Sequence, residues 1–215
     1  MKPDLKMIDK TLLSGRTVLI TEGSEGIGEA LAKVFLKAGA NVAVGFKNEG
    51  QHERLARIFE SAEKPYMLIH IPEATKEAVD GAVSRIESKI GSIDILVNHS
   101  DFFEDIPFSD TDESAWDYMM DVRLKSAYRF CSRVAPKMME KKYGRIINIS
   151  SLFAKTGGFP IGAGVHYCAA QAGLIGLSKG LAIKLAPFGI TVNSVCPSLV
   201  DTEAEKTRDA KEIDK

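Results

Sequence analysis

The sequence predicts a doubly wound α/β fold, in which helices cover both faces of a parallel β-sheet. Three observations support this prediction. Short apolar runs alternate with longer segments of helical period along most of the chain. The apolar runs are continuous in hydrophobicity, which is typical of strands that are covered on both faces. No linker, low-complexity tract or change of composition interrupts the alternation, so residues 1–215 are expected to form one domain.

The individual elements follow from this alternation. Strands are expected at 17–20, 41–44, 67–69, 93–97, 145–149 and 190–195. Helices are expected near 27–38, 51–62, 75–90, 112–141 and 166–187. Because each strand is followed by a helix long enough to cross the sheet, the connections favour parallel pairing.

Composition excludes several classes of protein. The chain of 215 residues is 45% hydrophobic and 27% charged, which is ordinary for a globular domain. Its formal charge of −1 gives no field to attract nucleic acid or an anionic membrane. No apolar run approaches the roughly 18 residues of a membrane span, and the first residues lack the apolar stretch of a signal peptide. Cys131, Cys168 and Cys196 have no metal-ligand spacing, so free thiols in a reducing cytoplasm are expected, with no metal site.

Two predicted helices are unusually apolar. Apolar residues spread around most of the helix at 166–187, whose few polar residues are Gln171, Ser178, Lys179 and Lys184. A helix with one solvent face would show a broader polar stripe. The segment at 112–141 is also rich in large apolar residues. A generous internal core is one explanation; a partner subunit that packs on both helices is the one we favour.

Five motifs occur in a fixed order. They are TEGSEGIG at 21–28, DILVN at 94–98, GRIINISS at 144–151, YCAAQAGL at 167–174 and GITVNSVCP at 189–197. From Thr17 to about Thr202 the chain therefore resembles a short-chain dehydrogenase/reductase of the 3-oxoacyl-reductase type, which implies a Rossmann-like fold. Members of that family continue with a lid helix and a final edge strand. Either this protein lacks the last strand and lid helix, or the sequence is incomplete.

The resemblance implies a dinucleotide site at the Gly-rich turn. Gly26 and Gly28 match the family's glycines, which let the pyrophosphate approach a helix N-terminus, but Glu22 replaces the first glycine. At roughly 5 Å and an effective dielectric near 20, one carboxylate repels an anion by about 3 kcal/mol. The alternative is that Gly23 takes over the turn and that Glu22 points to solvent.

The adenosine side also departs from the family pattern. His70 stands after the third strand, where the family usually has an acidic residue. The second strand ends without the aspartate that binds NAD, whereas Lys47 favours NADP and Glu25 opposes it. Asn98 is retained and, with Gly26 and Gly28, would contact any cofactor that still binds. The next residue, His99, has no companions for a metal site, so a core or solvent-facing histidine is expected.

The family's catalytic centre is a Ser-Tyr-Lys set with an Asn that holds a relay water. Ser151 and Tyr167 match the first two, but Gln171 stands at the lysine position and Arg123 at the relay position. A phenol with the ordinary pKa of about 10 is ionised in about one molecule in 1,000 at pH 7, and a neutral amide supplies no charge to change that. No intact catalytic set is therefore expected, unless the Arg123 guanidinium replaces the missing ammonium.

Three functions are compatible with this pattern. We favour a catalytically degenerate subunit that binds no cofactor itself and supports an active NAD(P)-dependent dehydrogenase through the helices near 112–141 and 166–187. It resembles the inactive subunits of hetero-oligomeric hydroxyacyl-CoA dehydrogenases, such as the one acting on a hydroxybenzylsuccinyl-CoA. The first alternative is an active NADP-dependent carbonyl reductase or alcohol dehydrogenase that uses Tyr167 and Arg123. The second is a nucleotide-sensing or scaffold protein.

Overall fold

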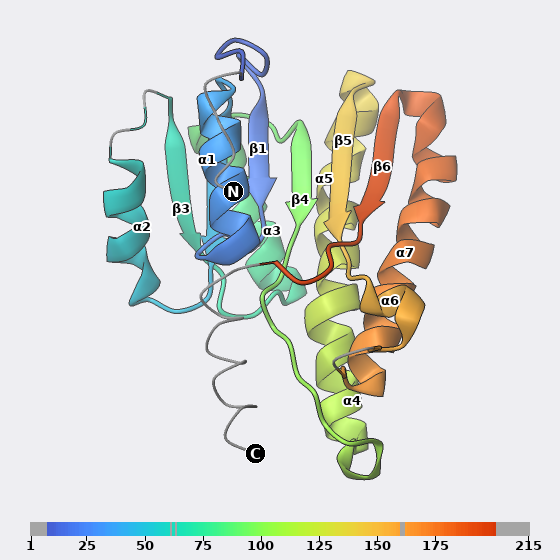
Figure 1. The fold of residues 1–215 in the computed structure, drawn as a ribbon. Coiled ribbons are helices and arrows are strands. Elements are labelled where there is room, and N and C mark those ends of the chain that lie inside the picture. Colours follow the sequence, from blue (N-terminus) through green and yellow to red (C-terminus); the bar gives the residue numbers. More distant parts are fainter. Residues whose placement is uncertain (1–7, 61, 63, 160–161, 201–215) are drawn as a thin grey trace.

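A six-stranded parallel sheet forms the centre of the protein, with the strand order β3-β2-β1-β4-β5-β6 (Figure 1). The computed structural model describes residues 8–60, 62, 64–159 and 162–200. The strands are β1 (Thr17–Ile20), β2 (Asn41–Phe46), β3 (Tyr66–His70), β4 (Ile95–Asn98), β5 (Gly144–Ile149) and β6 (Ile190–Val195). All six predicted strands are confirmed. The chain reverses direction across the sheet between β1 and β4, and such a point opens a crevice at the carboxyl ends of the strands.

Helices connect successive strands, as the alternating pattern predicts. They are α1 (Gly26–Lys37), α2 (Gln51–Phe59), α3 (Lys76–Lys89), α4 (Glu113–Met119), α5 (Ser126–Lys141), α6 (Phe153–Thr156) and α7 (Val165–Leu185). Short 3₁₀ turns lie at Phe108–Asp110 and Ala186–Phe188. Among the described residues, no helix is long and apolar enough to cross a membrane.

Two hydrophobic clusters lie on opposite faces of the sheet. On one face, Leu19 packs in a cluster with residues of α3 and α5, including Val83 and Phe130. On the other face, its neighbours Val18 and Ile20 pack in a cluster with residues of α1 and α2. Adjacent residues of one strand are thus buried in different layers, which is why the strand is apolar without alternation. The doubly wound prediction is confirmed.

The last strand differs from this pattern. Ile190 and Val192 are buried, whereas Thr191 and Asn193 are exposed. β6 is the edge strand of the sheet among the described residues, and its second face is not covered there by a helix. The lid helix and final strand of the family would follow it, and residues 201–215 lie outside the described part of the chain.

The helical stretch predicted at 112–141 consists of three parts. Between α4 and α5 the chain forms a π-helical segment, Met120–Lys125. A π-turn contains an extra residue, which changes the direction of the side chains that follow, and such turns often occur at functional sites. Arg123 lies in this segment and is buried.

Helix α7 packs against the sheet with one side only. Leu174 and Leu185 are buried, whereas Ile183 on the outer side is 75% exposed. A Cβ added at Gly176 or Gly180 would meet no atom of a neighbouring element within 4 Å, so open space adjoins both glycines. The second apolar side that the sequence predicts is therefore left uncovered by the residues that the structure describes.

Candidate functional site

The carboxyl ends of β1, β2, β4 and β5 surround the crevice. The Gly-rich turn, Lys47, the segment after Asn98 and Ser150-Ser151 follow these four strands in turn. Figure 1 shows the strands themselves. Helix α7 adds Tyr167 and Gln171 beside the same region, and the π-helical segment adds Arg123. The fold thus places Arg123 and Gln171 against Tyr167, and it places Glu22 against the segment that follows Asn98.

The Gly-rich turn keeps the backbone geometry of a phosphate-binding turn. Gly26 has a φ of +53°, a conformation that favours glycine. A Cβ on Gly28 would lie 2.3 Å from the Glu22 carbonyl oxygen, so only glycine fits. Glu22 is not among the described residues with positive φ, and it therefore replaces a glycine without backbone strain.

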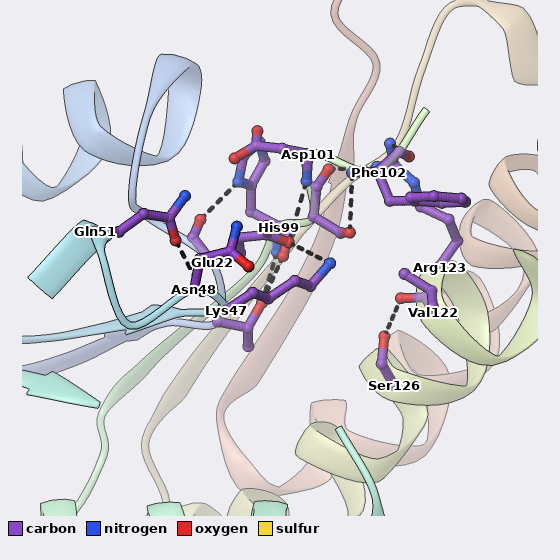
Figure 2. Close-up of polar contacts among 12 residues, drawn as sticks. Glu22, Lys47, Asn48, Gln51, His99, Asp101, Phe102, Val122, Arg123 and Ser126 are labelled. Atoms are coloured by element: carbon purple, nitrogen blue, oxygen red, sulfur yellow. Dashed lines mark hydrogen bonds and ion pairs between the residues drawn. The ribbon is translucent and has the colours of Figure 1, made fainter. Parts of the chain in front are cut away.

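Glu22 turns into the protein. Its side chain is 10% exposed; its Oε2 lies 3.0 Å from Lys47 Nζ and accepts a hydrogen bond of 3.2 Å from the backbone N–H of Asp101 (Figure 2). The alternative in which this carboxylate points to solvent is not what the structure has. Lys47 is engaged by Glu22, so its charge is largely neutralised before it could meet a 2′-phosphate.

His99 lies beneath this pair as a buried histidine, one of the two environments expected for it. Its Nδ1 donates to the Glu22 carbonyl oxygen at 2.7 Å, because a carbonyl can only accept. Burial lowers the pKa of His99, so the ring is neutral and its Nε2 is an acceptor. No group of three or more potential metal ligands occurs in the part of the chain that the structure describes.

The Asp101 carboxyl lies beside His99 Nε2, the ring nitrogen that can only accept a hydrogen bond. Its Oδ1 lies 3.2 Å from Nε2. Burial, and then the charges of Glu22 and Glu25, raise the pKa of the Asp101 carboxyl to about 8. The pair has the distance of an ion pair, but these shifts favour a neutral carboxylic acid that donates to a neutral imidazole. The raised pKa of Asp101 and the lowered pKa of His99 both favour the uncharged form of the group concerned.

Tyr167 is covered by aromatic side chains. It is 6% exposed, and Phe103 packs edge-on against it with the ring centroids 4.9 Å apart. Gln171 Nε2 donates to Tyr167 Oη at 3.0 Å, so the amide takes the place of the family's ammonium. Ser151 stands at the position of the family's serine, and its Oγ accepts a hydrogen bond from the backbone N–H of Phe153 at 3.1 Å.

Arg123 neither faces outward nor pairs with a carboxylate. Its guanidinium carbon lies 5.0 Å from the centroid of the Tyr167 ring. Its two terminal nitrogens donate to the backbone carbonyls of Ser100 and Phe102. The positive charge predicted for this position therefore reaches the face of the tyrosine, while its hydrogen bonds go to the chain that follows β4.

The Asn98 side chain is buried and hydrogen-bonded inside the protein. Its Nδ2 donates to Asn148 Oδ1 at 2.7 Å and approaches Cys131 Sγ at 3.3 Å. Asn148 in turn donates to Ser178 Oγ at 2.7 Å. These bonds join β4, β5 and α7, so Asn98 has a structural role that the sequence did not indicate.

A cavity of about 580 Å³ adjoins the crevice on the adenosine side. Its walls include Lys47, Pro72, Glu73, Tyr118, Asp121 and Lys125. His70, which the sequence placed after the third strand, is the last residue of β3. Its ring stacks on Phe46 and contacts the Lys47 carbonyl oxygen through Nε2 at 2.8 Å. Carboxylates and amines thus share the walls, without a cationic excess.

A dinucleotide fits only part of this arrangement. Gly26 keeps the positive φ of the family's turn, and Gly28 keeps the close backbone packing at the start of α1. However, the surroundings already keep the Asp101 carboxyl protonated to about pH 8, so a further anion beside Glu22 would be opposed by the same burial and charges. The residues present therefore do not fit the pyrophosphate of NAD(P) in this arrangement.

Sequence reasoning missed two contributors to the site. Neither was predicted as a site residue: Asp101 was interpreted only as part of residues 98–101, which replace the family's Asn-Asn-Ala-Gly turn, and Phe103 matches no family motif. A signal was nevertheless present: Asp101 lies two residues after a histidine, on the segment that leaves β4 at the crevice. Their roles depend on contacts with Glu22, His99 and Tyr167, which are distant in sequence or oriented only by the fold.

Comparison with known proteins gives a consistent result. The family model described as short chain dehydrogenase matches residues 16–213. The chain is 35% identical, over 209 residues, to a 3-oxoacyl-[acyl-carrier-protein] reductase of Rickettsia prowazekii, covering 95% of this chain and 81% of that protein. It is 34% identical to the reductase of the same name in Escherichia coli over 189 residues, covering 88% and 75%. It is 38% identical to an uncharacterized oxidoreductase of Bacillus subtilis over 193 residues, covering 89% and 71%.

Proposed function

The chain belongs to the short-chain dehydrogenase family, and from this premise we propose that it is a non-catalytic subunit of an oxidoreductase. It binds no nicotinamide cofactor itself and pairs with an active NAD(P)-dependent dehydrogenase of the same family. The substrate class that we propose for the complex is a hydroxyacyl-CoA thioester, such as a hydroxybenzylsuccinyl-CoA.

One observation carries the proposal: the crevice of this chain opposes negative charge. Glu22 is buried at the turn where the family binds pyrophosphate, and its carboxylate takes up the Lys47 ammonium. The Asp101 carboxyl has a pKa raised to about 8 in the same place. At the other end, Tyr167 has an amide as its hydrogen-bond partner instead of the lysine that the family uses. Cofactor binding and proton transfer are thus both impaired.

The outer face of α5 and α7 supports the pairing. Tyr128 is 54% exposed on α5, and Ile183 is 75% exposed on α7. The open space at Gly176 and Gly180 permits close approach of another helix. A partner of the same fold would cover this face with its own equivalent pair of helices, burying apolar area that the isolated chain leaves in water.

The direct test is a calorimetric titration of the purified chain with NADPH and with NADH. We expect no binding in the micromolar range and no turnover. The same assay is then repeated with the partner dehydrogenase, identified by co-purification from the source cells, and we expect an increase in activity over the partner alone. Micromolar binding of NADPH together with turnover by the isolated chain contradicts the proposal.

The partner surface is tested separately by native mass spectrometry of the co-purified complex. Ile183→Asp should abolish the complex without unfolding the chain, because the side chain is largely exposed. Leu12→Asp is a matched control, since Leu12 is 69% exposed and lies far along the chain from either helix. If the complex persists in Ile183→Asp, the partner does not bind through the outer face of α7.

A second function is favoured by the position of Arg123. Its guanidinium lies over the Tyr167 ring, and Gln171 donates to the phenol oxygen. This arrangement is compatible with an NADP-dependent carbonyl reductase or alcohol dehydrogenase that uses Tyr167 as its acid, with Arg123 in place of the usual lysine. In that case the isolated chain would reduce carbonyl compounds with NADPH, and Arg123→Gln would remove the activity. A third possibility, a nucleotide-sensing or scaffold protein, predicts a monomer without a co-purifying partner.

A further inference from the structure

We propose that residues 99–104, here called the strap, close the crevice over Tyr167, and that Glu22 and Arg123 hold the strap closed as a coupled pair. The inference concerns access to the site and does not depend on whether the protein acts with a partner. It assigns a common role to two residues that replace a glycine and an asparagine of the family pattern.

The strap has no secondary structure of its own. It follows β4 directly, and none of its residues belongs to a helix or strand. Backbone polar groups in a partly buried segment of this kind need partners from elsewhere in the protein or from water. Its first residue is fixed by two hydrogen bonds with Thr21: the His99 N–H donates to Thr21 Oγ1 at 3.0 Å, and that hydroxyl donates to the His99 carbonyl at 2.7 Å.

Residues 100–102 are hydrogen-bonded by two side chains, those of Glu22 and Arg123 (Figure 2). The carbonyls of Ser100 and Phe102 accept hydrogen bonds from Arg123, and the N–H of Asp101 between them donates to Glu22 Oε2 at 3.2 Å. Glu22 comes from the turn after β1, whereas Arg123 comes from the π-helical segment before α5. Neither side chain alone can satisfy all three backbone groups, so the closed strap requires both Glu22 and Arg123.

The strap then covers the tyrosine. Phe103 packs against the Tyr167 ring at 4.9 Å, and Phe102 packs edge-on against Tyr118 at 5.1 Å. Beyond them, Glu104 Oε2 lies 3.5 Å from Nε2 of His166 on α7. Tyr167 is 6% exposed, and Phe103 of the strap covers it together with Met119 and Phe153. Movement of the strap would therefore uncover one side of the ring.

Hydrogen exchange measured by mass spectrometry on the full chain tests the coupling. The variants are Glu22→Ala, Arg123→Ala and the double variant. Each single variant should raise the exchange rate of a peptide spanning the strap about tenfold, because buried backbone groups lose their partners. The double variant should exceed the single ones by little, since either loss already releases the strap.

Two control variants match the lost charges. Arg129→Ala removes a guanidinium that also binds a backbone carbonyl, that of Ala74, at 2.9 Å. Glu29→Ala removes an ion-paired carboxylate from α1. Neither touches the strap, so exchange there should stay within about twofold of the wild type. Equal acceleration in the controls would overturn the proposal.

Nitration with tetranitromethane reports access to Tyr167 directly. In the wild type, Tyr118 and Tyr128 should react, because they are 52% and 54% exposed, while Tyr167 should not. Tyr167 should become reactive in the two strap variants and remain protected in the controls. Unchanged protection of Tyr167 from nitration in the double variant contradicts the proposal. The coupling is also contradicted if the increases in exchange rate of the two single variants multiply in the double variant.

The unmodified chain provides a test that needs no variant to fold. Exchange is followed in low concentrations of urea. Strap amides should exchange through a local opening that depends little on urea, while the amides of β4 and β5 require global unfolding. If the strap amides exchange only by the global unfolding that exposes the amides of β4 and β5, the strap does not open separately and the proposal is wrong.

Discussion

Replacing Asp101 with asparagine tests the electrostatics of the crevice most directly. In the folded protein the carboxyl keeps its proton up to about pH 8, whereas its ordinary pKa is 3.8. Asparagine is neutral at every pH and can donate to His99 Nε2 in the same way as the protonated acid. The substitution therefore keeps the hydrogen bond and removes the titration.

The direction in which pH changes the free energy of unfolding follows from the number of protons bound by each state. Between pH 6.5 and 8 the unfolded chain has lost the protons of both His99, whose ordinary pKa is 6.5, and Asp101. The folded chain has lost that of His99 and kept that of Asp101. It thus binds one proton more than the unfolded chain, and rising pH favours unfolding. Below pH 6.5 the lowered pKa of His99 acts in the opposite direction, so the two groups partly cancel there.

The magnitude is about 1.4 kcal/mol per pH unit, or about 2 kcal/mol over the window from pH 6.5 to 8. We expect the free energy of unfolding of the wild type to fall by this amount relative to Asp101→Asn. Urea denaturation followed by the fluorescence of Trp116, the single tryptophan, gives both curves. Asp105→Asn, which removes an exposed carboxyl of the same loop, is the control. Parallel curves for Asp101→Asn and the wild type would show that Asp101 is already ionised at pH 6.5, and the neutral pair would be refuted.

Four further outcomes are expected. Gln171→Lys alone should restore no turnover with NADPH, because the crevice still opposes the cofactor; measurable activity would show that the lysine position is the main defect. Gly28→Ala should lower the free energy of unfolding by about 1 to 3 kcal/mol, because the new Cβ would lie 2.3 Å from a carbonyl oxygen. Phe130→Ala, at a side chain that is 2% exposed, should cost about 3 to 5 kcal/mol in urea denaturation. Ser178→Ala should cost about 1 to 3 kcal/mol in the same assay, because it removes the acceptor of the Asn148 amide.

The fold followed closely from local pattern. The strands are marked by short apolar runs, and the helices by a period that their own residues define, so both can be predicted without knowledge of distant contacts. The π-helical segment was not predicted, since an inserted residue within a long helix leaves no mark in the hydrophobic pattern. The alternation at β6 was also not predicted, because it depends on what covers that edge of the sheet.

The site was only partly readable. Gln171 and Arg123 could be identified as substitutions, and the single turn between Tyr167 and Gln171 made their contact predictable. In the sequence, Glu22 and Arg123 are two separate departures from the family pattern. In the structure both bind the strap.

The sequence alone determined the layers of this protein, the family and the loss of the lysine beside Tyr167, since these depend on residue type and short spacing. Only the tertiary structure decided that Glu22 turns inward and that Arg123 binds the strap. The direction of a long charged side chain is set by partners that lie far away in the chain. Those partners, Asp101 for Glu22 and the carbonyls of Ser100 and Phe102 for Arg123, reach them only after β1, β4 and the π-helical segment have met at one end of the sheet.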